Sequence, residues 1–186
     1  MKRPHGMQSV WVMLGAAAVI LLAFALATST VAQGPSEQVR SLALRWLLLN
    51  DDVGEEGVLE GELRNMGTQL EPVFLEALDK GPDSALLSEL EQAAATRFEQ
   101  NQELLKTGEG LGLSPEDLEA ARSVTREQFI AQEKEDFILR YKSQAIAGLG
   151  ITGTDKVREV LQEIARDETS PLKSSAELAL QKLLQR

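Results

Sequence analysis

The chain contains no cysteine and only one histidine, His5, which stands close to its beginning. Without cysteine there can be no disulfide, no thiolate metal ligand and no cysteine nucleophile. Because no histidine follows position 5, the rest of the chain also lacks the residue most often used as general base and metal ligand. We therefore expect no catalytic residue, no metal site and no cofactor.

Aromatic residues make up only 4% of the chain, and no stretch shows the alternation of β-branched residues that is typical of a strand. Alanine, leucine, glutamate and glutamine dominate instead, and all four favour helices. A hydrophobic content of 43% over 186 residues is sufficient for one domain with its own core. The composition predicts an all-α fold. Most of its aromatic residues fall on apolar helical faces and are expected in the core: Trp46, Phe74, Phe98, Phe129, Phe137 and Tyr141.

The first part of the chain has the features of an export signal. Lys2 and Arg3 precede an uncharged apolar run over residues 10–27, and small residues follow. This order is typical of a secretory signal peptide, with cleavage after Ala27 or after Ala32. An uncleaved membrane anchor is the alternative, since such a run is at the short end of what spans a bilayer. In both cases the following chain is predicted to be exported, to the periplasm or the outside of the cell.

The expected division of the chain is a signal peptide or anchor over 1–32, a linker over 33–36 and a single helical domain over 37–186. Without Lys2 and Arg3 the chain has 17 basic and 29 acidic residues, and so a formal charge of −12. This balance disfavours non-specific binding to nucleic acid or to anionic lipid. We expect a protein partner, with a basic one favoured, and membrane contact only through an uncleaved N-terminal segment.

Apolar residues at spacings of three and four predict a series of helices. The expected helices span residues 37–50, 58–66, 68–80 and 84–106. The acidic segment 50–57 lacks the spacing of an EF-hand, and we interpret it as a solvated loop and not as a cation site.

A capping signal at Ser114, followed by Pro115, predicts a further helical section that runs to Ala147. This section is either one helix or two with a kink at residues 133–135.

The last forty residues carry the clearest pattern. Gly148, Gly150 and Gly153 predict a helix end and a turn, after which Thr154 is expected to cap an amphipathic helix. Ser170 is expected to cap a second helix, with Pro171 in its first turn. The apolar face of that second helix is predicted to be buried: Leu172, Ala176, Ala179, Leu180, Leu183 and Leu184.

These glycines also match G-x-G-x-x-G, the fingerprint of dinucleotide-binding proteins. That fingerprint requires a strand before the glycines, whereas residues 140–147 have the pattern of a helix. We therefore reject nucleotide binding.

The helix–turn–helix over 146–184 resembles one unit of the HEAT-type α-solenoids, a family of stacked two-helix repeats. A weaker match lies over 63–98, where Leu75, Leu78, Ser84 and Leu86 recur 86 residues later as Leu161, Ile164, Ser170 and Leu172. That distance is about two HEAT periods. The resemblance implies a short solenoid with a long helical middle section, in which residues 99–145 form either a diverged repeat or an inserted hairpin.

The resemblance further implies a protein-binding scaffold or adaptor, in which the second helices of successive pairs line one surface. On that surface Lys173, Glu177 and Lys182 are the candidate partner-binding residues. Some HEAT-like relatives are enzymes that hold iron through His-Glu motifs; this chain lacks those histidines, so that activity is not carried over. Two alternatives stay open: a carboxylate-based hydrolase or lyase of the cell envelope, and a membrane-tethered structural spacer.

Overall fold

The computed structural model describes residues 35–49, 53–107 and 114–185, and the predicted export segment lies outside them. Within the described residues every regular element is a helix, which confirms the all-α prediction. In that same part of the chain, none of the helices combines the length and apolar character that a membrane crossing requires. The helices from Glu37 onward form one unit and are described by themselves.

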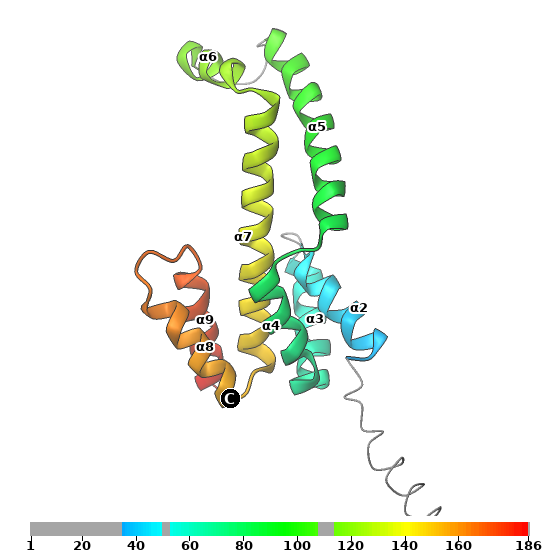
Figure 1. Ribbon diagram of the computed structural model, residues 1–186, viewed down its shortest axis with the longest axis vertical. Helices are drawn as coiled ribbons and strands as arrows, with labels where there is room; N and C mark the ends of the chain where they lie inside the picture. The colour runs from blue at the N-terminus through cyan, green and yellow to red at the C-terminus, as the bar shows by residue number, and fades with distance from the viewer. Residues whose placement is uncertain (1–34, 50–52, 108–113, 186) are drawn as a thin grey trace, which may run out of the picture. The chain divides into compact units, whose positions relative to one another are not determined.

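The long helix α7 (Arg126–Thr152) is the element on which this unit is built. Helices α2 (Glu37–Leu47), α3 (Val53–Met66) and α4 (Glu71–Lys80) pack on one side of its C-terminal half. Helix α9 (Lys173–Leu184) packs on the other side, and α8 (Asp155–Arg166) packs on α9 (Figure 1). The last turns of α7 are apolar on all sides, as expected for a helix enclosed by others.

Helix α2 is tied to α7 by Trp46. Its side chain is 1% exposed, and its Nε1 donates to the backbone oxygen of Gln144 at 2.7 Å. Phe74 from α4 and Tyr141 from α7 are buried in the same core. The prediction of a core position is thus confirmed for these three aromatic residues.

The glycines of α7 are a correction to the sequence analysis. The helix continues to Thr152, so Gly148 and Gly150 lie inside it and not in a turn. The reason is close packing: a Cβ on Gly148 would lie 2.6 Å from Cε2 of Phe74. A Cβ on Gly150 would lie 2.8 Å from Cα of Ala179. Only Gly153 ends the helix, by donating its N–H to the oxygen of Leu149.

The helical context of these glycines agrees with the rejection of a dinucleotide site. The residues before them belong to α7, and no strand occurs among the residues that the structure describes. Thr154 stands at the N-cap of α8 as predicted, although its side chain makes no capping hydrogen bond.

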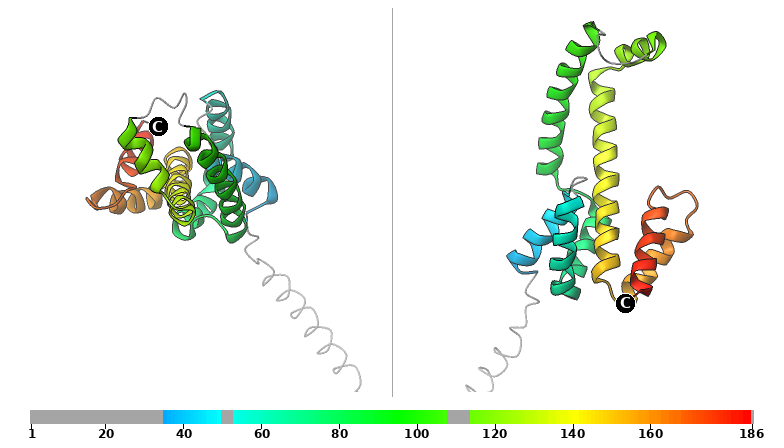
Figure 2. Two further views of the ribbon diagram at one scale, coloured as in Figure 1. Left: turned by 90° about the horizontal axis from the view of Figure 1, so that it is seen from above. Right: turned by 180° about the vertical axis from the view of Figure 1, so that it is seen from behind.

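Helix α5 (Ser84–Thr107) runs beside the N-terminal half of α7, and α6 (Pro115–Ser123) lies at the far end of this pair (Figure 2). We call α5, α6 and residues 126–140 of α7 the arm. Ser114 caps α6 as predicted, since its Oγ accepts from the N–H of Asp117 at 3.1 Å. Helix α6 ends before Val124, and α7 starts with the capping box of Thr125 and Gln128. Residues 133–135, where a kink was one of the two expected alternatives, lie inside the single helix α7.

Two further boundaries differ from the predictions. Helix α3 begins at Val53, so much of the expected loop over 50–57 is helical, with Glu55 and Glu56 in a first turn that favours negative charge. A short 3-10 helix, η1 (Gly67–Leu70), precedes α4.

Helix α9 begins at Lys173, later than predicted, because Ser170 and Pro171 form a turn before it. The hydroxyl of Ser170 accepts from the N–H of Leu172 at 3.2 Å, within that turn. The predicted cap therefore closes the turn and does not cap the helix.

Candidate binding surfaces

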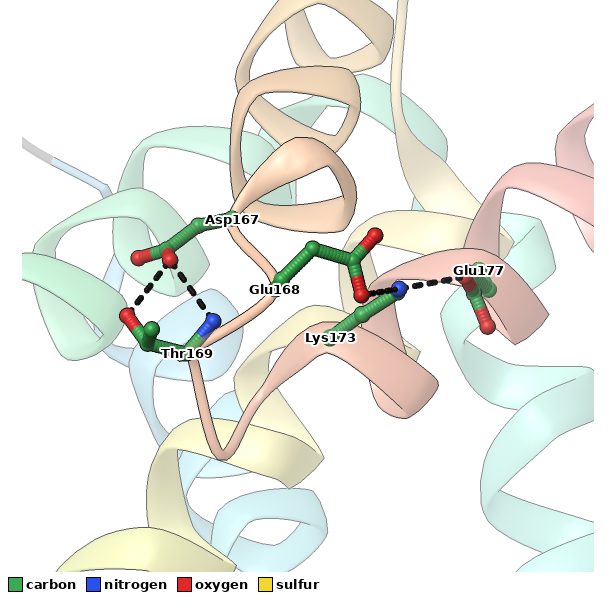
Figure 3. A network of polar contacts seen from close by, with 5 residues as sticks. All are labelled: Asp167, Glu168, Thr169, Lys173 and Glu177. Atoms are coloured by element: carbon green, nitrogen blue, oxygen red, sulfur yellow. Dashed lines mark hydrogen bonds and ion pairs between the residues drawn. The ribbon is translucent and has the colours of Figure 1, made fainter.

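The three predicted binding residues all lie on α9, and the first of them, Lys173, forms ion pairs within the chain. Nζ of Lys173 lies 2.5 Å from Oε2 of Glu168 and 4.0 Å from Oε1 of Glu177 (Figure 3). The hydrogen bond that Lys173 donates to Glu168, aided by the charges of Glu168 and Glu177, raises the pKa of Lys173. Lys173 and Glu177 thus stabilise the start of α9.

The turn between α8 and α9 is ordered by Asp167. Its Oδ1 accepts from the N–H of Thr169 at 2.9 Å and from the hydroxyl of Thr169 at 2.7 Å. These two bonds hold the pKa of Asp167 below its usual value, so the carboxylate is charged and the turn is locked at neutral pH.

Lys182 joins α9 to α3. Its Nζ lies 3.2 Å from Oε2 of Glu60, whose other oxygen accepts from Arg64 at 2.6 Å. The hydrogen bond from Arg64, followed by that from Lys182, lowers the pKa of Glu60 against the opposing effect of burial. All three predicted residues therefore have ion-pair partners within the chain, and their part in partner binding stays a prediction.

The arm offers a larger surface that the sequence analysis did not single out. In its described part, the only fully buried hydrophobic residues are Ala94 and Ala95. Larger apolar side chains that recur at helical spacing on α5 and α7 are only partly buried there: Leu87, Leu90, Phe98, Leu105, Phe129, Ile130, Phe137 and Ile138. A hollow of about 340 Å³ lies at Ala95 and Ile130, and its other lining residues are polar: Ser88, Glu91, Gln92 and Arg126. We call this partly exposed apolar strip the seam.

Ion pairs hold the two helices of the arm together and engage two of its basic groups. Lys134 of α7 lies 2.6 Å from Glu91 of α5, and Arg97 pairs with Glu133. The rings of Phe98 and Phe129 are 5.8 Å apart, a distance typical of a favourable aromatic contact.

Two basic groups nearer the end of the arm are also engaged within the chain. Lys106 pairs with Glu103. Arg122 donates to the backbone oxygen of Leu105 at 2.7 Å and so satisfies a carbonyl at the end of α5.

The carboxylates of the arm are left in excess. Within the described residues, several glutamates of the arm have no ion-pair partner: Glu89, Glu99, Glu119, Glu127 and Glu135. The arm therefore combines a partly exposed apolar strip with a negative surface, a combination suited to a partner with the opposite charge.

A second concave surface lies between α2, α4 and α7. It is a cleft of about 410 Å³ with mostly apolar walls, and the ring of Tyr141 forms part of its lining. Arg40, Glu76, Lys80 and Asp83 surround these walls. This cleft, like the seam, comes from the packing of helices that are distant in sequence.

The described residues leave acidic side chains as the candidates for metal binding or acid–base chemistry. They contain no group of three histidine, cysteine or acidic side chains placed to hold a metal ion. The carboxyl groups whose pKa is shifted there, Glu60, Glu76 and Asp167, all have it lowered by hydrogen bonds. A general acid would need the opposite shift.

No family model, curated protein or solved structure matches the chain. The similarity to HEAT-type repeats therefore rests on the sequence pattern alone and stays a prediction.

Proposed function

We propose that this chain is an exported HEAT-like repeat protein that acts as a binding scaffold or adaptor in the cell envelope. The pairs α4–α5 and α8–α9, related by the sequence offset of 86, are both helix–turn–helix units. Their second helices, α5 and α9, both contact α7, and α4 contacts it as well.

The observation that carries the proposal is the seam of the arm. Two helices can cover only one side of each other, so the larger apolar residues of α5 and α7 stay partly exposed. A partner helix laid along the seam would bury them and could place a side chain in the hollow over Ala95. The unpaired carboxylates beside the seam favour basic residues on that partner.

The test is site-specific photo-cross-linking in intact cells. A photoreactive residue at Leu90 or Ile138 of the seam should form an adduct with one basic envelope protein. The same residue at Glu163, on the exposed side of α8, should not form that adduct.

Charge reversal separates a docking surface from a chance neighbour. The double variant Glu99→Lys/Glu127→Lys should reduce the adduct about tenfold or more, because like charges would then meet across the interface. Glu159→Lys/Glu163→Lys makes the same change in net charge on α8 and should leave the adduct unchanged. Equal yields from the two double variants, or equal adducts at seam and control positions, would contradict the proposal.

A further inference from the structure

The cleft between α2, α4 and α7 has the character of a small binding site. Its walls are the side chains of Leu44, Leu47, Val73, Ala77 and Pro82. At about 410 Å³ it is near the lower end of the sizes usual for ligand sites. It has room for one large side chain and the adjoining backbone, but is small for a long acyl chain.

Tyr141 places a polar group in this apolar surface. The residue is only 7% exposed, yet its hydroxyl has no hydrogen-bond partner among the residues that the structure describes. Among the described residues, the only fully buried side-chain nitrogen or oxygen without a partner is Nε of Arg158, so the Tyr141 hydroxyl is open to the cleft. Since the ring lines the cleft, the missing partner would come from whatever fills it.

The charges around the cleft determine what kind of partner Tyr141 can take. Burial, together with the negative charges of Asp83 and Glu76, raises the pKa of Tyr141, so its hydroxyl stays protonated and can donate. Arg40 and Lys80 also line the cleft and balance the charges of Glu76 and Asp83, so its rim carries no net charge and suits a neutral acceptor. Glu76 is paired with Lys80 at 2.8 Å, and Asp83 accepts from the N–H of Leu86 at 2.9 Å, so both are held in place.

We propose that this cleft binds one leucine- or phenylalanine-type side chain of a partner's peptide segment, while Tyr141 donates to a neighbouring backbone carbonyl. The apolar walls take the side chain, and the neutral carbonyl is the acceptor that the balanced charges suit. The inference rests on the proposed binding function, but it concerns a surface distinct from the seam.

The probe is N-acetyl-leucine methylamide, a neutral compound that carries one such side chain and two carbonyl groups. Added to the full chain, it should shift the methyl signals of Leu44, Leu47 and Val73 in nuclear magnetic resonance spectra in a saturable way. Tyr141→Phe keeps the ring and removes the donor, and should weaken binding roughly threefold to tenfold.

Two exposed leucines supply a matched pair of variants. Leu44→Gln removes part of the cleft wall and should weaken binding of the probe. Leu139→Gln changes a residue of similar exposure that does not line the cleft, and should leave binding unchanged. Both side chains are more than a third exposed, so neither change should prevent folding.

N-acetyl-leucinate, which carries a free carboxylate, should bind more weakly than the neutral probe, and decanoate should not bind more tightly than either. No saturable shift, equal binding to wild type and Tyr141→Phe, or preferential binding of decanoate would overturn the inference. Failure here with the arm-dependent adduct intact would leave the proposed function standing. Loss of that adduct with probe binding intact would contradict the proposed function and leave the binding of the probe in the cleft standing.

Discussion

At the scale of single residues, the glycines of α7 give the sharpest test of the packing. Gly150→Ala should destabilise the protein by about 1–3 kcal/mol, because the added methyl group would overlap the backbone of α9 at Ala179. This loss should outweigh the helix propensity gained, which is about 1 kcal/mol. Denaturant unfolding of the two proteins measures the difference.

Gly61 provides the matched control. It is exposed within α3, and a Cβ there would meet nothing within 4 Å. Gly61→Ala should therefore stabilise the protein by about 0.5–1 kcal/mol. A Gly150→Ala variant that is stabilised as Gly61→Ala is would contradict the close approach of α9 to α7.

Glu60 makes stability depend on pH. Because its pKa is lowered in the folded state, its ionised form contributes stability that is complete well above the ordinary value of 4.5. That contribution is lost as the pH falls through the lowered pKa. The free energy of unfolding of Glu60→Gln should therefore be lower than that of wild type at pH 7, by about 1 kcal/mol or less. The difference should vanish in acid.

Unfolding measured from pH 7 to pH 3 checks this expectation. In an Arg64→Gln background the pH-dependent difference should shrink, because Arg64 is the main cause of the lowered pKa. An unchanged difference in that background would assign the effect to another group.

At the scale of the elements, the sequence predicted helices well and their contacts poorly. The apolar spacing predicted most of the helices, and the cap at Ser114 was placed correctly because a capping signal is local. The glycines of α7 were misread because a helix-ending glycine and one that admits a neighbouring helix are identical in sequence. Only Phe74 and Ala179, distant along the chain, distinguish the two cases.

The same reason explains what was missed of the candidate sites. Lys173, Glu177 and Lys182 could be placed on the polar side of one helix, but their partners Glu168 and Glu60 depend on a turn and on a second helix. The seam has one visible signal, namely the charge-rich stretch around residues 127–140 with apolar residues at helical spacing. The cleft at Tyr141 has none, since its walls come from three separate helices.

Within the arm, the break between α6 and α7 is fixed by a reciprocal cap. The N–H of Gln128 donates to Oγ1 of Thr125, and the N–H of Thr125 donates to Oε1 of Gln128. Thr125→Ala should cost about 1 kcal/mol and should speed amide hydrogen exchange in the first turn of α7. Thr125→Ser keeps the acceptor and should preserve both properties; equal exchange in the two variants would contradict a role for the cap.

At the scale of the molecule, most of the buried core lies outside the arm, although Leu86 and Phe137 of the arm pack against it. Apart from Ala94 and Ala95, the buried hydrophobic residues in the described part of the chain lie outside the arm. Replacing residues 92–133 by a short Gly-Ser turn would remove half of the seam, namely Phe98, Leu105, Phe129 and Ile130.

The shortened chain should still unfold cooperatively, with a free energy of unfolding within about 1 kcal/mol of the full chain. The shorter connection between α5 and α7 recovers loop-closure entropy, which offsets the weak packing that is removed. Cross-linking to the basic partner from a photoreactive residue at Ile138, which is present in both chains, should be lost. A shortened chain that no longer unfolds in one transition would show that the arm is part of the core. A shortened chain that still forms the adduct in full would place the docking surface elsewhere on the helices around α7.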